Sequence, residues 1–497
     1  MEGMGSDSRK QAYLILGLTS ALALAWPLPH TIALRNVLMA FLMMVLFPQT
    51  QWNSVRELLT GPGKRAAIIY AVFTAWILFV AFFISPFPHW TLSEITGQWL
   101  SAAVALALGL LTASQGDSRL GRIVVVGLLV VLSVQVAAVD AQGLWIALSD
   151  GNLGQMARLG GLSAGPGKAS YLTNFLLCGL IAELSLRMEG RRNINISSLA
   201  LGTLLSLCVL SIYFEAMRNE LFDVAVFMFF VGLIGYQRYS KATPKRALIV
   251  ATASVLILVG LIIVDAIADP RWNSLWATIP IALDTTRHLA WLNGRIFPLP
   301  HLPDGHVVSA SNYLRIAWIK EGLYAIIEHP LGVGFGRSAF GHALMLRYGS
   351  LTGDTGLNNS LITIGIGTGI PGLALWLGWF ISLGRFSLKR FSGPRAFYAR
   401  FLLLIILAFG IRMAMDNVMQ NYTLEQVLYF FGLLGALCVS SSPAARAVTA
   451  GGGGQDEDRA DGGVVCGKNL LRIPGDLREP IGSGLGLREG FEGISLR

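Results

Sequence analysis

The chain has 497 residues, of which 54% are hydrophobic and 13% charged, and its formal net charge is +9. Its mean hydropathy of +0.59 excludes a soluble globular protein and indicates an integral membrane protein. The basic residues stand in short clusters between apolar runs rather than on one face, so they indicate contact with a lipid bilayer and not with nucleic acid. The cysteines, Cys178, Cys208, Cys438 and Cys466, lack metal or disulfide spacing, so they indicate neither a disulfide framework nor a zinc site. No metal and no cofactor are expected.

Apolar runs of membrane-spanning length recur along the chain and predict an all-α polytopic protein with about twelve transmembrane helices. They fall near 11–28, 31–48, 66–85, 95–113, 122–140, 169–187, 197–215, 220–236, 247–265, 359–383, 400–416 and 424–440. The first run contains a signal-peptidase-like Ala-Leu-Ala, but the next run follows within a few residues, so we expect a retained span. The expected parts are a cytoplasmic segment over 1–10, a helix bundle over 11–440 and a Gly-rich, disordered cytoplasmic tail over 441–497.

Lysine and arginine are concentrated in alternate loops, which predicts the orientation of the bundle. One set of loops contains Arg56, Lys64, Arg65, Arg119, Arg122, Arg187, Arg191, Arg192, Arg238, Lys241, Lys245, Arg246, Arg385, Lys389, Arg390 and Arg395. The other set is nearly uncharged apart from Arg158, Lys168, Arg218 and one long segment over 266–358. We therefore expect both termini in the cytoplasm and 266–358 as one large loop on the outside of the membrane, between the ninth and tenth spans.

The 266–358 segment is the longest polar stretch between apolar runs, and it is rich in Trp, Pro and His. Loops of this length are usually functional or disordered, and this composition does not favour disorder. We therefore treat the segment and the start of the next span as a candidate site. The residues they supply are Arg315, His329, Arg337, His342, Asp354, Asn358 and Asn359.

Charged side chains within spans need an explanation, because each costs roughly 2.5–3.5 kcal/mol near the bilayer centre. Those near the outer ends of predicted spans are Arg35, Glu215, Arg218, Glu220, Asp223, Arg412 and Asp416. Arg35 is open to a second explanation, snorkelling to the headgroups, and Arg412 is spaced to pair with Asp416 on one helix face. Arginines at this surface suit a pyrophosphate, because guanidinium forks bind phosphate oxygens bidentately. We expect Arg218 and Arg315 to bind it, with Arg158 and Arg412 as further candidates.

The glycine-rich stretch 332–336 lacks the Gly-Lys-Ser/Thr ending of a phosphate loop. Two interpretations remain open, a tight turn that brings the backbone close to a ligand and a simple loop-to-helix connection.

Order, spacing and topology together resemble the O-antigen ligase and polysaccharide polymerase superfamily of bacterial envelope proteins. The family pattern of Arg and Trp, then His-Pro, then Gly-x-Gly is present as Arg315, Trp318, His329-Pro330 and 332–334, and the closing pattern as 358–372. Arg218 matches the Arg of the family's Ser-Arg-Gly turn. The resemblance implies a GT-C-like bundle in a bacterial inner membrane, with the large loop over 266–358 in the periplasm. It also implies metal-independent transfer of a glycan from a polyprenyl-pyrophosphate donor to a hydroxyl of a lipid or glycan acceptor.

Two positions depart from the family pattern, since Asn358 replaces its His and Gly367 its Glu. The resemblance implies that this His assists the acceptor hydroxyl. An amide cannot take up a proton near neutral pH, so Asn358 and Asn359 would only position the acceptor. If a base is needed, the nearest candidates in the chain are His342 and Asp354.

Two other classes of function remain open. A non-catalytic family member would bind lipid-linked glycan or a partner enzyme, which the missing His makes a real alternative. A solute transporter would also fit the number of spans, although the sequence shows neither an internal repeat nor a pair of broken spans.

The predicted orientation places Ser309 in the periplasm and Ser392 in the cytoplasm. In a chain whose native cysteines are replaced by serine, a cysteine at 309 should react with an impermeant thiol reagent on intact spheroplasts. A cysteine at 392 should react only after lysis, and equal labelling of the two would contradict the orientation.

Overall fold

The computed structural model describes residues 6–115, 118–151, 158–217, 219–239, 244–268, 274–353, 356, 358–419 and 421–439. The tail predicted over 441–497 lies outside these residues, as do the candidate site residues Arg218 and Asp354. The predicted N-terminal segment over 1–10 is described only from Ser6, where the first helix already begins.

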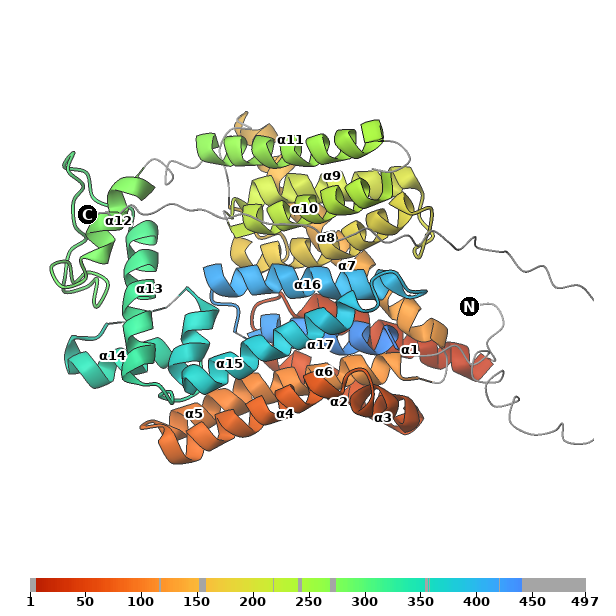
Figure 1. The fold of residues 1–497 in the computed structure, drawn as a ribbon, viewed down its shortest axis with the longest axis horizontal. Coiled ribbons are helices and arrows are strands. Elements are labelled where there is room, and N and C mark those ends of the chain that lie inside the picture. Colours follow the sequence, from red (N-terminus) through yellow and green to blue (C-terminus); the bar gives the residue numbers. More distant parts are fainter. Residues whose placement is uncertain are drawn as a thin grey trace, which may run out of the picture. The chain divides into compact units, whose positions relative to one another are not determined.

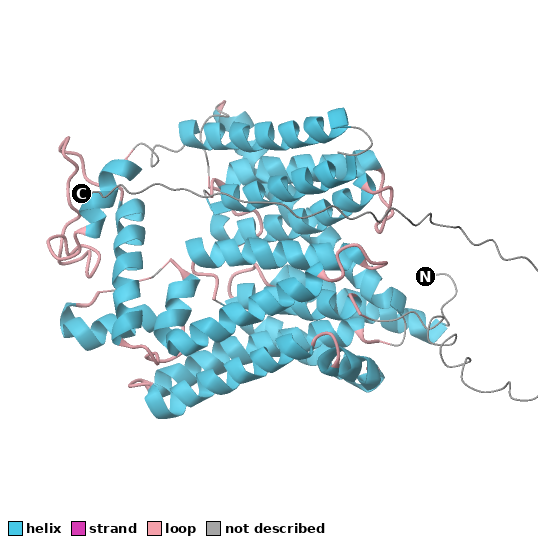
Figure 2. Cartoon of the chain, in the orientation of Figure 1, coloured by secondary structure: helices cyan, strands magenta, loops and turns pink. Residues whose placement is uncertain are grey.

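The described chain is helical, with no β-strand among its residues (Figure 2). The helices that coincide with predicted apolar runs are α1 (Ser6–Ala25), α2 (Ile32–Leu46), α4 (Lys64–Phe79), α6 (Ser101–Ala113), α7 (Ser118–Asp150), α8 (Pro166–Met188), α9 (Ser198–Glu215), α10 (Asn219–Tyr239), α11 (Pro244–Ala268), α15 (Ser360–Leu388), α16 (Ala396–Met415) and α17 (Asn421–Leu437). Among the described residues, 8 helical stretches are long and apolar enough to cross a membrane. A multi-pass membrane protein is therefore supported, while about twelve crossings remains a prediction from the sequence.

Several elements have no counterpart in the predicted runs. They are the short helices α3 (Trp52–Thr60), α5 (Pro88–Glu94), α12 (Leu275–Leu283) and α14 (Ala339–Tyr348), the longer helix α13 (Ala310–Glu328) and a single turn at Gly349–Leu351. Three other turns overlap predicted runs: Phe47–Gln49 at the end of 31–48, Val80–Ile84 within 66–85 and Ile95–Leu100 within 95–113. The segment expected to be a loop over 266–358 thus contains helices, and α11 extends into it as far as Ala268. Its helices enclose their own apolar cluster, which includes Trp291, Tyr313 and Phe340. Figure 1 shows α13 running across the direction of the bundle helices.

The sequence divides the loops into a set rich in lysine and arginine and a nearly uncharged set. At each end of the bundle, one hydrogen bond joins two loops that belong to the same set. At the end rich in lysine and arginine, Arg122 donates to the carbonyl of Asn193. At the other end, Leu159 N donates to Phe214 O at 3.0 Å. These two contacts agree with the predicted grouping of the loops they join. We call the end where Leu159 meets Phe214 the outer end, after the orientation that the sequence predicts.

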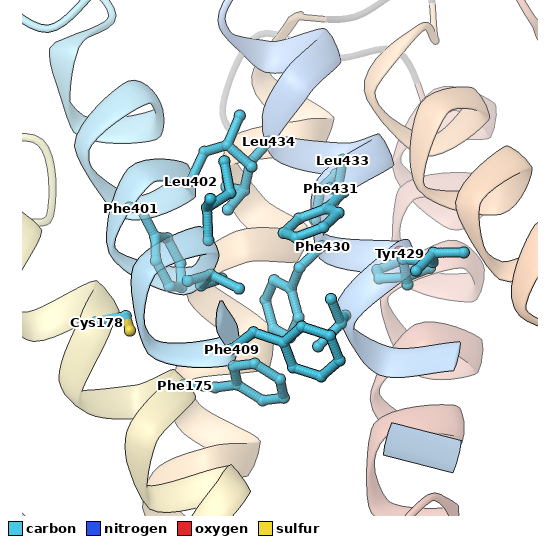
Figure 3. Packing of buried hydrophobic residues seen from close by; sticks show 14 of the residues in the cluster. Phe175, Cys178, Phe401, Leu402, Phe409, Tyr429, Phe430, Phe431, Leu433 and Leu434 are labelled. Atoms are coloured by element: carbon cyan, nitrogen blue, oxygen red, sulfur yellow. The ribbon is translucent and has the colours of Figure 1, made fainter. Parts of the chain in front are cut away.

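The core lies between α8, α16 and α17. The ring of Phe430 on α17 packs on Phe175 of α8 and Phe401 of α16, with centroid distances of 5.2 Å and 5.8 Å (Figure 3). In a bilayer such packing gains little from the hydrophobic effect, because lipid tails are as apolar as the side chains. Close backbone approach and polar contacts must therefore select the arrangement.

Close approach is clearest between α6 and α17. A Cβ at Gly109 of α6 would overlap the carbonyl oxygen of Tyr429, and one at Gly432 of α17 would overlap that of Leu106. Small residues at a helix crossing allow the backbones to touch, which is a main source of helix association in membranes.

The long helix α15 is broken at Gly369, which has a φ of 70° and a ψ of −177°, and Pro371 follows two residues later. A break leaves backbone groups without helical partners, and each unsatisfied group in a membrane costs several kcal/mol. Four hydrogen bonds close this break: Val333 N to Ile366 O (3.0 Å), Gly334 N to Gly367 O (2.9 Å), Ile370 N to Pro330 O (2.9 Å) and Trp76 Nε1 to Thr368 O (2.7 Å).

The glycine-rich stretch 332–336 therefore packs backbone against backbone on the broken helix. A Cβ at Gly332 would lie 2.5 Å from Gly367 O, and a Cβ at Gly367 would lie 2.8 Å from Gly334 O. Of the two interpretations left open by the sequence, the stretch is a connection from loop to helix. The same contact leaves no room at 367 for the Glu of the resembled family.

Gly369→Ala should destabilise the protein, because the new Cβ would overlap Pro330 O in a backbone conformation that L side chains rarely adopt. We expect a cost of about 1–3 kcal/mol, visible as a lower thermal midpoint in detergent. Gly378→Ala, on the same helix with no atom within 4 Å of the new Cβ, is the matched control and should not lower the midpoint. Equal loss in both variants would show that the break is not strained.

Candidate functional site

Arg412 is the centre of a polar network at the outer end, and its side chain is only 1% exposed. Its Nε donates to Asp223 Oδ2 at 2.9 Å and its Nη2 to Ser170 Oγ at 2.7 Å. Glu220 Oε1 lies 3.5 Å from Nη2 and Asp416 Oδ2 lies 3.9 Å from Nη1. A buried charge without a partner is costly, so these contacts connect α16 firmly to α8 and α10.

Further buried carboxyl groups continue the network away from Arg412. Thr173 Oγ1 donates to Glu215 Oε1 at 2.7 Å, and Ser211 Oγ donates to Asp140 Oδ1 at 2.7 Å. Glu215 and Glu220 are both fully buried. These polar contacts also connect α9 to α8 and α9 to α7.

A second buried pair lies beside the first. Arg35 of α2 is 5% exposed, and its Nη1 lies 3.1 Å from Glu425 Oε2 of α17. Trp26 Nε1 donates to the same oxygen at 3.0 Å. Of the explanations open for Arg35, snorkelling to the headgroups is thus wrong, because a carboxylate within the bundle pairs with it.

A cavity of about 220 Å³ lies between the start of α8 and the segment 416–423. Lys168, Tyr171, Asp416, Asn417 and Tyr422 contribute to its lining. Lys168 is exposed, and its Nζ lies 5.4 Å from the centroid of the Tyr422 ring. Pro166 occupies the first turn of α8, a position where its missing N–H is not needed. The start of α8 thus places a cation at the edge of the cavity.

Arg158 lies near the same helix start. It is exposed, and its Nη2 is 3.9 Å from Met217 Sδ. A Cβ at Gly167 would lie 3.5 Å from Cε of that methionine. Met217 therefore brings Arg158 close to the beginning of α8, and it directly precedes Arg218 in the chain, which is outside the described residues.

The pair Asn358 and Asn359 begins α15. Asn359 is the N-cap, since its Oδ1 accepts from Ile362 N at 3.0 Å, and its Nδ2 donates to Ala414 O at 2.7 Å. Ser360 Oγ donates to Asp416 O at 2.9 Å. Asn359 thus has a structural role, whereas Asn358 is exposed beside the segment that contains Asp416.

The other predicted residues lie in the segment outside the bundle. Arg315 is half-buried on α13, which packs against α12, α14 and α15. His329 ends the same helix. Arg337 Nε lies 3.5 Å from Glu94 Oε1 at the start of the fourth predicted span. These contacts do not join the three residues to the Arg412 network, so the predicted site is divided between two regions.

Of the two candidate bases named from the sequence, the structure describes His342 but not Asp354. Tyr313 is a buried, titratable phenol of the same segment. His342 stacks on Trp90 with a centroid distance of 3.9 Å, and its Nδ1 lies 2.9 Å from Ser338 O. Tyr313 OH donates to His288 O at 2.7 Å, and burial raises its pKa to about 12. Both side chains are held by local contacts, and Tyr313 keeps its proton at neutral pH.

Comparison with protein-family models and with curated proteins gives no match for this chain. Among the residues that the structure describes, no group of three or more His, Cys, Asp or Glu is placed to hold a metal ion.

Sequence reasoning identified the outer charges but not all of their partners. It named Arg412 and Asp416, and the structure places both in one network. It missed Asp140 and Asn174, although each is a polar residue inside a predicted apolar run, and it missed Glu425 as the partner of Arg35. Polarity within a span was the available signal for all three.

Replacing Arg412 by Met should leave Asp223 buried without its guanidinium. Breaking a buried pair in this way costs about 3–5 kcal/mol, so the thermal midpoint in detergent should fall markedly. Arg385→Met, at an exposed position in the last turn of α15, is the control and should change the midpoint little. A stability unchanged in both variants would show that the network does not hold the helices together.

Proposed function

We propose that the protein is a membrane glycan transferase of the O-antigen ligase or polysaccharide polymerase type. It would move a polyprenyl-pyrophosphate-linked glycan to an acceptor hydroxyl on the periplasmic side of a bacterial inner membrane. One observation carries the proposal: two exposed cations, Arg158 and Lys168, lie at the outer end near Met217 and beside a polar cavity. The resemblance of the motifs over 315–372 supports the same function.

In the proposed reaction the acceptor oxygen attacks the anomeric carbon of the donor. A new C–O bond forms as the bond from that carbon to the pyrophosphate oxygen breaks, and the pyrophosphate leaves with the electron pair. The hydroxyl proton passes to a base or to water, and Asn358 cannot be that base. Cations near the leaving group stabilise its developing charge, an effect worth roughly 3 kcal/mol for each well-placed group.

A solute transporter is the second candidate, and the broken helix α15 is the observation that favours it. Transporters bind substrate at breaks whose free backbone groups face a cavity. Here the groups around Gly369 hydrogen bond to 330–333, to Gly334 and to Trp76. The break is therefore closed by protein, and it gives a solute no backbone groups to bind.

A non-catalytic member of the resembled family would also bind lipid-linked glycan at the outer end. Asn358 is exposed, and it lies two residues before Ser360, which hydrogen bonds to Asp416 O at the edge of the cavity. A histidine introduced at 358 would therefore be exposed near the cavity, so the Asn358→His variant tests this alternative.

Arg218→Lys and Arg315→Lys should each reduce transfer from a lipid-linked glycan by tenfold or more with the protein still in the membrane. The physical reason is that a lysine point charge does not replace a bidentate fork on phosphate. The measurement is glycan transfer by purified protein in lipid nanodiscs. Arg287→Lys, an exposed arginine of the extramembrane segment, is the control and should keep full transfer.

Normal transfer in both arginine variants would reject an anionic lipid ligand at these residues. A wild type that does not transfer, with transfer gained in Asn358→His, would identify a non-catalytic glycan-binding protein instead. Genes for sugar transferases and a flippase beside this one would argue against the transporter.

A further inference from the structure

We propose that the cavity between the start of α8 and the segment 416–423 binds one sugar ring through its hydroxyl groups. The proposal rests on the proposed function and deepens it, since it assigns the neutral part of the substrate to one cavity. It is argued from the polar atoms of the lining, their charges and the volume.

Three lining residues, Tyr171, Asn417 and Tyr422, carry buried polar atoms that have no hydrogen-bond partner among the described residues. Among the residues described by the structure, neither Tyr171 OH nor Asn417 Oδ1 has a hydrogen-bond partner. Tyr171 is 7% exposed, and its ring lies 4.6 Å from the Arg412 guanidinium carbon. A buried polar group without a partner destabilises the protein, so a ligand that hydrogen bonds to both atoms removes this cost when it binds.

The charges of the lining favour a neutral ligand. Lys168 supplies one positive charge and Asp416 one negative charge, and both line the cavity. Behind Tyr171, the charge of Arg412 is taken up by Asp223 and the acids beside it. An anion would therefore meet a carboxylate within the cavity, whereas an uncharged polyol meets no repulsion.

The donors and acceptors match hydroxyl groups in particular. Asn417 Oδ1 and Asp416 only accept hydrogen bonds, Lys168 only donates, and Tyr171 OH does both. A fully ionised pyrophosphate has no proton to give to Asn417. Neighbouring hydroxyls of a pyranose ring give and accept at once, and can satisfy all four groups.

The volume sets the size of the ligand. The cavity of about 220 Å³ is below the range of about 300–1,000 Å³ found for drug-sized ligands, so it suits a single sugar ring and not an oligosaccharide. Waters alone would also fit, since the volume corresponds to roughly seven waters of liquid density. Binding must therefore be measured directly.

The test uses the full-length protein in nanodiscs and saturation-transfer NMR with methyl α-D-glucopyranoside, methyl α-L-rhamnopyranoside and methyl N-acetyl-α-D-glucosaminide. At least one glycoside should give signals above those of empty nanodiscs. Tyr171→Phe and Asn417→Leu should each weaken that glycoside's binding by about threefold or more, because each removes one hydrogen-bonding atom. Tyr398→Phe removes a buried phenol at the opposite end of α16 and should have no effect.

Thermal unfolding shows that each variant is folded before its binding is compared. No signal from any glycoside, or equal binding in wild type and both cavity variants, would overturn the proposal and leave a water-filled cavity. Loss of the glycoside signal on addition of inorganic pyrophosphate would also overturn it, since the cavity would then be an anion site.

The sugar can come from the donor or the acceptor, and a competition separates the two. Displacement by a polyprenyl pyrophosphate that bears one sugar, but not by the bare lipid pyrophosphate, places the donor sugar in the cavity. No displacement by either places the acceptor sugar there. Glycoside binding without glycan transfer would reject the proposed transferase function but support sugar binding in the cavity. Glycan transfer that is unchanged in Tyr171→Phe would support the transferase function but reject sugar binding in the cavity.

Discussion

A charged side chain inside a membrane must be paired, and Arg412 shows how much of this structure follows from that requirement. Its guanidinium contacts Asp223 and Ser170, so α16, α10 and α8 meet at fixed heights along the bundle. The segment that follows Arg412 then receives the start of α15, because Ser360 donates to Asp416 O. The position of Asn358, and with it the rim of the candidate site, depends on this pairing.

The second constraint is the backbone at Gly369, and it changes what the glycine-rich motif means. The motif contributes N–H groups that satisfy carbonyls of the broken helix, and Gly332 and Gly367 leave room for that contact. A large part of the resemblance to glycan ligases therefore consists of residues that close a helix break. Residues with this structural role do not indicate a reaction, which has to be argued from the outer cavity.

Hydropathy located the helices well, because a bilayer leaves an apolar run few alternatives to a helix. The folded segment over 275–348 was missed because α12 and α14 are short, while α13, although it has 19 residues, contains Arg315, Lys320 and Glu321 among its apolar residues. These helices share a local apolar cluster that includes Tyr313. The pairing of Arg35 with Glu425 was missed because the residues are 390 positions apart. The candidate site was predicted as separate charges near the outer surface. Which of them meet depended on helix order, which a single sequence does not give.

The outer end contains two kinds of cation, one that is buried and paired and two that are exposed. Arg412 is neutralised by buried acids, so its charge does not reach into the solvent. Lys168 and Arg158 stay exposed, and their field extends over roughly 10 Å at 0.1 M salt. Under the proposed function, a lipid-linked anion at the membrane surface would meet these cations first, and the cavity lined by Lys168 and Asp416 would bind a neutral ring. In the proposed transfer, the bond to be broken lies between pyrophosphate and sugar. The exposed cations would bind the pyrophosphate on one side of that bond, and the neighbouring cavity would bind the sugar on the other side.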